Sequence, residues 1–421
     1  MSNFKSKFLQ ECEARGFLNQ CTNIEELDRQ LTEGKPIIAY WGTDPTGASL
    51  HVGHLFSLMM IRLFQRCGNK PIILLGGATG QIGDPSGKDK SRPMMSLETL
   101  NENKKGIKKS IEKFIKFGTG ETDAILVDNY DWWKDRNYLE LLRDIAPHIS
   151  VNRMLTFESV KQRLAKEAHM SFLEFNYMIL QAYDFYHLYK NYNCSLQLCG
   201  GDQWGNVVAG VELVRKLQFV NEEVEKGKKT EVLGFSTPLL LDSNGKKVGK
   251  SEGNAIWINE DLLSPYEYFQ FFRNVNDRDV IRFLRIYTDL SVDEISKLSS
   301  QNVNNINALK KILAFEATKL CHGEEEAKKA LEQAESIFNG NSLDALPKLE
   351  YSLPDNEKSI FQLIKNLNLA PSGGEAKKLI RGGGVKINDK KIEDENLDIS
   401  NMDDFKLSVG KKKHFLISIK K

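Results

Sequence analysis

A short apolar strand that enters a glycine-rich turn and leaves it as a helix most constrains this fold. The strand is expected at residues 36–40, and apolar residues at helical spacing follow over residues 50–64. His51 and His54 stand three residues apart at the start of that helix, so their side chains point the same way. Spacing alone leaves a phosphate site, a metal pair or no site open. The position favours a phosphate, because strand ends in α/β sheets bind ligands and a helix start exposes amides.

The alternation of strand and helix continues along the chain. Further apolar strands are expected at residues 71–75, 124–127 and 194–199, and helices at residues 137–146, 157–168, 171–190 and 207–216. Strands and helices that alternate, with glycine at the strand ends, predict a parallel, doubly wound α/β sheet.

The composition is that of a globular chain without a membrane segment. The 421 residues are 41% hydrophobic and 27% charged, and no apolar run approaches the roughly 20 residues that span a bilayer. The start of the chain is polar, unlike a signal peptide. The six cysteines form no CxxC pair, which favours reduced thiols over disulfides or a structural metal. We therefore expect a cytoplasmic protein with no membrane partner and no protein-bound metal.

Composition shifts divide the remaining chain into domains. Ser264-Pro265 is typical of a helix start, and a run of asparagine, glycine and proline predicts a linker at residues 341–356. Residues 357–421 carry 14 Lys and Arg against 9 Asp and Glu, a net charge of +5. This makes them a candidate for contact with a polyanion, although an excess of this size is more often just a solvated face. We expect an α/β domain over 1–235, a lysine loop and linker over 236–264, a helical domain over 265–340, and a small α+β domain over 357–421.

Three further motifs place polar groups together. On the expected helix 171–190, Tyr177, Gln181 and Asp184 fall at i, i+4 and i+7 and so face one side. This face either binds a ligand or is solvent-exposed, with the polar side chains hydrogen-bonded to one another. The run Gly83-Asp84-Pro85-Ser86-Gly87 by itself favours a structural turn. The third motif is a loop, Lys247-Val248-Gly249-Lys250-Ser251.

The whole chain resembles a class I aminoacyl-tRNA synthetase, because these motifs occur in the order that this family shows. The histidine pair resembles the HIGH signature and the lysine loop resembles the KMSKS signature. The aspartate turn, the polar helix face and Asp202-Gln203-Trp204-Gly205-Asn206 are similar to bacterial and organellar tyrosyl-tRNA synthetases. The resemblance implies a Rossmann-like catalytic domain and an anticodon-side helical domain. It also implies activation of L-tyrosine by ATP to tyrosyl-adenylate with release of pyrophosphate, then transfer to the 3′ end of tRNA(Tyr).

The resemblance also assigns roles to individual residues, in a reaction that needs positioning and charge stabilisation. The expected catalytic donors are Thr46, His51, His54, Lys247 and Lys250, with Mg²⁺ accompanying ATP. The expected tyrosine contacts are Tyr40 and Asp184 at the phenol, Asp84, Tyr177 and Gln181 at the ammonium, and Gln197 and Gln203. The expected ATP contacts are Gly42, Asp44, His51, Gly53, His54, Lys88, Arg92, Asp202, Lys247, Lys250 and Ser251. Trp41 and Gly201 depart from the family pattern, which has a small residue and a serine there.

The end of the chain resembles the small RNA-binding domain first described in a ribosomal small-subunit protein, which implies salt-dependent contacts with RNA phosphates. A homodimer bridged by tRNA is implied as well, with an interface over residues 130–151. Two other functions stay open, a tryptophanyl-tRNA synthetase and an RNA-binding or splicing factor on the same scaffold. The Tyr40–Asp184 pair and the basic end argue against the first. Alanine at His54 and Lys250 would distinguish the second, which would keep its RNA activity.

Overall fold

The computed structural model describes residues 3–84, 95–167, 169–221, 231–251, 254–339, 348–354, 358–370, 372–400, 402–410 and 413–420. The chain forms two compact units, Met1–Ala327 and Lys328–Lys421. Within the described ranges, no helix has the length and apolar character needed to cross a membrane. All six cysteines are free thiols.

The first unit is built on a six-stranded sheet in the order β1-β6-β5-β2-β3-β4. Its strands are β1 (Gln20–Cys21), β2 (Ile38–Thr43), β3 (Lys70–Leu75), β4 (Ile125–Asp128), β5 (Leu196–Gly200) and β6 (Leu233–Thr237). The neighbours from β6 to β4 pair in parallel, and β1 joins β6 antiparallel. The predicted parallel sheet is therefore confirmed. The edge strand β1 was not predicted, because two residues are too short to show a period.

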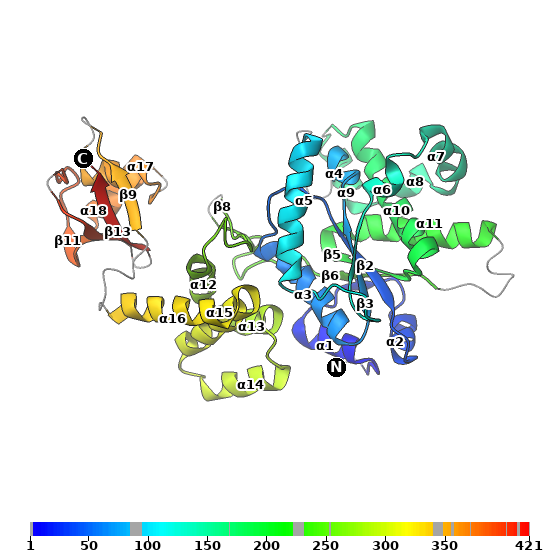
Figure 1. The fold of residues 1–421 in the computed structure, drawn as a ribbon, viewed down its shortest axis with the longest axis horizontal. Coiled ribbons are helices and arrows are strands. Elements are labelled where there is room, and N and C mark those ends of the chain that lie inside the picture. The colour runs from blue at the N-terminus through cyan, green and yellow to red at the C-terminus, as the bar shows by residue number, and fades with distance from the viewer. Residues whose placement is uncertain are drawn as a thin grey trace. The chain divides into compact units, whose positions relative to one another are not determined.

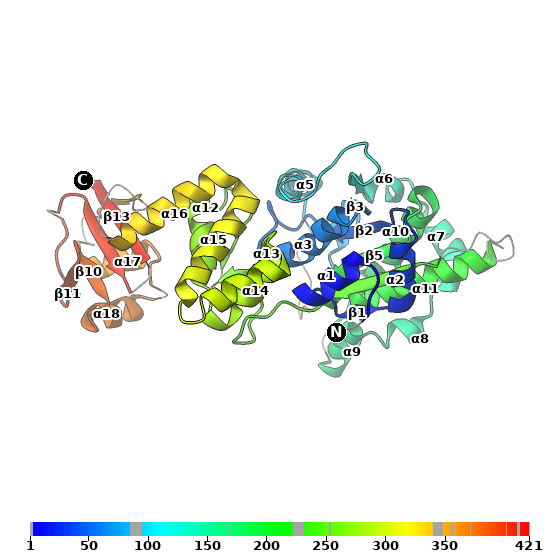
Figure 2. The same ribbon diagram turned by 90° about the horizontal axis from the view of Figure 1, so that it is seen from below.

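Two crossovers leave the centre of this sheet in opposite directions. Helix α3 (Val52–Arg66) connects β2 to β3, and α11 (Trp204–Val220) connects β5 to β6. Because such crossovers are right-handed, helices that run outward in opposite directions cover opposite faces. Figures 1 and 2 show α3 and α11 on opposite sides of the strands. The strand order therefore reverses between β2 and β5, which is where open α/β sheets bind ligands.

The helices predicted at residues 137–146, 157–168 and 171–190 are present close to those positions, whereas the helices before residue 36 and the helix that starts at Leu97 were not predicted. Helix α10 (Phe172–Tyr192) starts with a capping box between Ser171 and Glu174, and α12 (Pro265–Arg273) starts with one between Ser264 and Glu267. The other helices of this unit are α1 (Lys7–Arg15), α2 (Ile24–Thr32), α4 (Thr79–Ile82), α5 (Leu97–Glu112), α6 (Tyr130–Trp133), α7 (Tyr138–Asp144), α8 (Val151–Met154), α9 (Glu158–Ala165), α13 (Val280–Tyr287), α14 (Val292–Gln301) and α15 (Ile306–His322). Helix α16 (Glu324–Asn339) crosses the boundary between the units.

The helices after residue 265 contact the sheet domain, and up to Ala327 they share one compact unit with it. Arg15 of α1 donates to three carbonyls between residues 285 and 290, and Arg62 of α3 pairs with Asp289 at 2.6 Å. Tyr287 of α13 donates its hydroxyl proton to the Val52 carbonyl at 3.2 Å. These contacts join segments more than 200 residues apart, so no local sequence pattern signals them.

The second unit contains a five-stranded sheet in the order β11-β10-β12-β13-β9 with two helices. Its elements are β9 (Lys348–Ser352), α17 (Ile360–Asn366), α18 (Gly373–Arg381), β10 (Val385–Ile387), β11 (Lys390–Ile392), β12 (Phe405–Val409) and β13 (Lys413–Lys420). Strand β9 corrects the prediction, which placed its residues in the linker 341–356. It pairs in parallel with β13 about 70 positions later, so its strand character depends on a distant partner.

Candidate functional site

The residues that were predicted to contact a bound tyrosine converge where the strand order reverses. Tyr40 of β2 lies opposite Gln197 of β5 in the parallel register. Tyr177, Gln181 and Asp184 lie on successive turns of α10, which packs against β2. Tyr177 and Asp184 are buried, as expected for a helix face that turns toward the sheet and not toward solvent. The predicted polar stripe is therefore an interior feature.

Asp184 is the most enclosed charge of the site, with only 2% of its surface exposed. Its Oδ2 accepts a hydrogen bond from Asn129 at 2.9 Å, and its Oδ1 accepts from the indole N–H groups of Trp132 and Trp133, each at 2.8 Å. Burial raises the pKa of Asp184 to about 7, while the three donors lower it. Sequence analysis missed these donors. Asn129 directly follows the end of β4, which was a usable signal, whereas the two tryptophans gave none.

Three of the predicted tyrosine contacts carry a buried polar atom without a hydrogen-bond partner among the described residues. These atoms are the hydroxyl of Tyr40, Oε1 of Gln181 and Oε1 of Gln197. Burial raises the pKa of the Tyr40 hydroxyl, and the nearby charge of Asp184 raises it further. A buried polar group without a partner costs roughly 1–3 kcal/mol. Three of them in one place indicate a site built for a polar ligand.

Two carboxylates lie near the Tyr177 hydroxyl. The Tyr177 hydroxyl donates to Oδ2 of Asp44 at 2.9 Å, and the Thr79 hydroxyl donates to Oδ1 of Asp44 at 2.7 Å. Gln203 donates its Nε2 hydrogen to Oδ2 of Asp84 at 2.6 Å. Burial and the charges of Asp44 and Asp84 raise the pKa of Tyr177, which places both carboxylates near its hydroxyl. Such a cluster suits a cationic group, and Asp44, predicted for ATP, lies within it.

The two histidines lie together, but the expectation of exposed amides beside them is wrong. Their rings stack with centroids 3.9 Å apart. The Gly53 amide donates to Nδ1 of His51 at 3.1 Å, and the His51 amide donates to Nδ1 of His54 at 3.3 Å. The Val52 amide bonds the Ile256 carbonyl. Because each Nδ1 is an acceptor, each neutral ring carries its proton on Nε2, so imidazole N–H groups replace the amides as donors.

The lysine loop packs directly on the histidine turn. Its last two residues form β7 (Lys250–Ser251), which pairs antiparallel with β8 (Asn254–Ala255). A Cβ on Gly53 would lie 2.7 Å from the Val248 carbonyl oxygen, so only glycine allows this approach. Partial desolvation raises the pKa of Asp202, Asp84 raises it further, and the charge of Lys247 lowers it, which places Lys247 near the end of β5.

For the other residues that were predicted to take part in catalysis or to contact ATP, the structure gives only exposure or no description. Thr46 and Gly42 are exposed in the segment that follows Tyr40. Lys88 and Arg92 lie outside the described residues, as do the side chains of Lys250 and Ser251.

The two departures from the family pattern have different structural settings. Trp41 is buried and, because side chains alternate along a strand, it lies on the face of β2 opposite Tyr40. A Cβ on Gly201 would lie 2.9 Å from the Thr237 carbonyl oxygen, closer than Cβ atoms normally come. Glycine therefore fits at residue 201 and a serine would require β6 to shift.

Comparison with known proteins covers the whole chain. Residues 32–339 match the family model of tRNA synthetases class I (W and Y), and residues 340–417 match that of a tyrosine–tRNA ligase SYY-like C-terminal domain. The tyrosine–tRNA ligase of Rickettsia conorii is 49% identical over 421 residues, which is 98% of this chain and 100% of that protein. That of a Wolbachia from Brugia malayi is 48% identical, over 99% of each chain. A C-terminally truncated mitochondrial tyrosyl-tRNA synthetase from Aspergillus nidulans has a similar structure, with a TM-score of 0.70, 32% identity, and coverage of 79% of this chain and 94% of that one.

Proposed function

The chain belongs to the class I tRNA synthetases of the tryptophan and tyrosine group and ligates tyrosine to its tRNA. We propose that the polar residues of β2, β5 and α10 that face one another perform the activation step. In that step the tyrosine carboxylate attacks the α-phosphate of ATP, the carboxylate oxygen–phosphorus bond forms, and pyrophosphate leaves. The adenylate then gives its acyl group to the 3′ end of tRNA(Tyr), and AMP leaves.

The assignment of tyrosine as the substrate rests on the buried hydroxyl of Tyr40, which has no hydrogen-bond partner among the described residues. Beside it, Asp184 supplies a carboxylate, so a phenol O–H donates to Asp184 and accepts from Tyr40. An apolar ring in the same place would leave both groups buried without a partner, which disfavours phenylalanine. At the far end Asp84, Tyr177 and Gln181 bind the ammonium, with Asp44 as a second carboxylate, and Gln197 and Gln203 complete the pocket.

The histidine turn and the lysine loop stabilise the charge that develops on the phosphates. His51 and His54 donate through Nε2, and Lys247 and Lys250 add cations, with Thr46 as a hydroxyl donor. A positioned donor of this kind contributes about 2.7–4 kcal/mol to transition-state stabilisation. Gly42, Gly53, Asp202 and Ser251 contact the nucleotide, and Lys88 and Arg92 contact pyrophosphate. Mg²⁺ accompanies ATP and neutralises part of the charge on its phosphates.

Exchange of labelled pyrophosphate into ATP tests this proposal. We expect exchange that depends on tyrosine and is lost in His54→Ala, since the variant lacks a phosphate donor while its tyrosine pocket is intact. No exchange with tyrosine, or equal exchange with tryptophan, would refute the proposed activity. Exchange that persists in His54→Ala would refute the role of His54 in stabilising the phosphates.

A homodimer in the cytoplasm is the proposed working form. The supporting observation is a group of exposed apolar side chains, namely Tyr130, Tyr138, Leu139, Leu142, Val151, Leu155, Leu164, Phe172 and Leu173. We call this group the apolar face. These side chains recur along residues 130–173, and a contiguous exposed apolar patch often marks a site of protein contact. It includes the predicted range 130–151 and extends it to the start of α10.

A further inference from the structure

Two neighbouring indoles share one oxygen of the buried carboxylate at the phenol end of the pocket. Trp132 and Trp133 of α6 both donate to Oδ1 of Asp184, and Asn129 donates to Oδ2. A carboxylate oxygen accepts about two hydrogen bonds through its lone pairs. Oδ1 is therefore saturated, and Oδ2 keeps one acceptor position. The two indoles thus determine which oxygen a ligand can reach.

We propose that Trp133 is a positioning residue that fixes the Asp184 carboxylate so that Oδ2 accepts the phenol proton of tyrosine. The proposal rests on the proposed role of Asp184 in binding the phenol. Trp133 acts through Asp184 and contacts no reacting atom, so it belongs to substrate selection and not to the chemical step.

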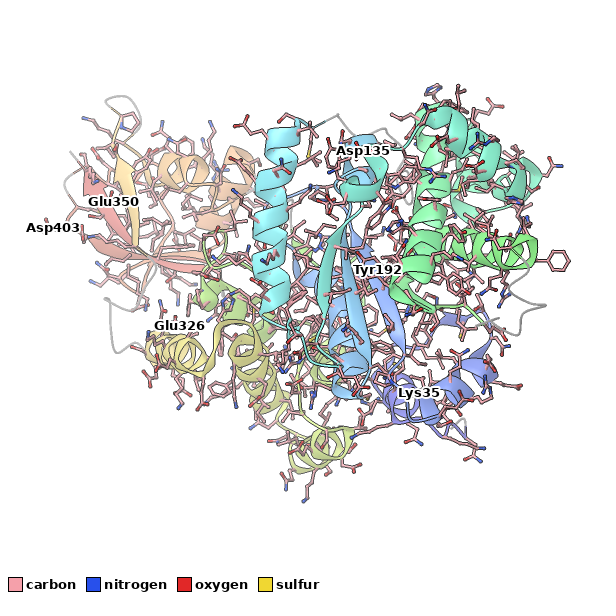
Figure 3. All side chains as sticks on the ribbon, turned by 45° about the vertical axis from the view of Figure 1, so that its right-hand side comes forward. Lys35, Asp135, Tyr192, Glu326, Glu350 and Asp403 are labelled. Atoms are coloured by element: carbon pink, nitrogen blue, oxygen red, sulfur yellow. The ribbon has the colours of Figure 1, made fainter. Side chains whose placement is uncertain are left out.

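The ring of Trp133 is itself held in place. It packs on Tyr183 with centroids 4.9 Å apart, and Arg136 covers the same tyrosine with its guanidinium 4.6 Å from the ring centre. Arg136 also donates to the Tyr183 hydroxyl at 2.8 Å. Trp132 is held separately by stacking on His187, with the ring centres 4.3 Å apart. Both line a cleft together with Tyr192. Figure 3 marks Tyr192, at the end of α10. Each indole therefore has its own support, and one can be changed without displacing the other.

The electrostatic surroundings explain why a third donor matters. Asp184 faces Tyr40 from β2, Asp44 from the turn after β2, and Tyr177 and Tyr183 from its own helix, and none of these is cationic. Only neutral donors therefore stabilise its charge against burial. Loss of one donor raises the pKa of Asp184 further, and the protonated acid cannot accept the phenol proton at that oxygen.

The test is the pH dependence of kcat/KM for tyrosine in pyrophosphate exchange with Trp133→Phe, which keeps a ring against Tyr183 and removes the N–H. We expect kcat/KM near pH 6.5 to fall about tenfold, since one hydrogen bond to a charged group is lost, and to recover at higher pH. The value for phenylalanine should not change. The matched control Tyr183→Phe keeps both rings and the Trp133 N–H, and it should show the wild-type profile.

Four outcomes separate the possibilities. A folded Trp133→Phe with the wild-type profile would overturn the proposal, and so would a loss that is equal at all pH values and for both amino acids. If Asp184→Ala keeps the preference for tyrosine, the proposed role of Asp184 itself fails. If only Asp184→Ala loses that preference, the role of Trp133 alone fails. Should the phenylalanine variant unfold, benzothienylalanine at residue 133 supplies the indole shape without the N–H and gives the same decision.

Discussion

At the scale of single residues, Gly53 shows how closely the two signatures approach each other. A Cβ there would lie 2.7 Å from the Val248 carbonyl oxygen and 2.8 Å from the His51 ring. Opposite it, Gly249 adopts φ +104°, a conformation that other residues rarely take. Gly53 therefore makes room for the lysine loop, whereas the sequence alone assigned this glycine only to nucleotide contact.

Replacement of Gly53 by alanine tests this reading. We expect Gly53→Ala to slow pyrophosphate exchange at saturating tyrosine by at least about tenfold, because the loop donors shift away from the phosphates. Tyrosine affinity, measured by equilibrium dialysis, should stay unchanged. Gly47→Ala is the matched control, since its Cβ would meet only ordinary contacts at 3.6 Å or more. Equal rates in the two variants would contradict the close approach.

At the scale of elements, α5 forms hydrogen bonds with the segment before the histidine pair and with the segment after the lysine loop. Its Ser110 hydroxyl donates to Oδ1 of Asn259 at 2.9 Å and lies 3.0 Å from the Ser49 hydroxyl. The Leu50 amide donates to the same Ser110 oxygen at 3.1 Å. Ser49 and Leu50 precede the histidines, and Asn259 follows β8. A buried hydrogen-bonded network of this kind holds separate segments in one arrangement.

Gly106 of α5 gives the corresponding prediction. Alanine normally stabilises a helix interior by about 1 kcal/mol relative to glycine. Here its Cβ would lie 1.8 Å from the Ala48 carbonyl oxygen, so the helix must move. We expect Gly106→Ala to lower the free energy of unfolding in urea by about 1–3 kcal/mol. Lys105→Ala, on the exposed side of the same helix, should change it by less than about 0.5 kcal/mol. Stabilisation by Gly106→Ala would show that this approach is not as close as described.

At the scale of the whole molecule, the apolar face predicts self-association. Leu139 and Phe172 are each 72% exposed, which is costly for side chains of this size in a monomer. We expect Leu139→Asp or Phe172→Asp to shift the protein from dimer to monomer in sedimentation velocity at micromolar concentration. Lys35→Asp, elsewhere on the surface, should leave the dimer intact. A monomeric wild-type protein would refute the interface.

The second unit predicts a separate effect on RNA. Lys378 and Lys386 are exposed near the α18–β10 connection. If each contacts a phosphate, Lys378→Ala with Lys386→Ala should raise the KM for tRNA and reduce the salt dependence of log affinity by about one per lost contact. Tyrosine-dependent pyrophosphate exchange should stay at the wild-type rate. An unchanged salt dependence would assign RNA contact to other residues.

The sequence alone determined the local elements and the chemistry of the ligand. Periodicity gave the strands β2 to β5 and the helices α3, α10 and α11, because burial on one face imposes a repeat that can be read along the chain. Motif spacing placed Tyr177, Gln181 and Asp184 on one face of a helix. Only tertiary structure decided that Trp132 and Trp133 hold Asp184, that the histidines satisfy their own amides, and that β9 belongs to the second sheet. The contacts of the tryptophans and of β9 join residues far apart in the chain, and local patterns carry no information about which distant partners meet.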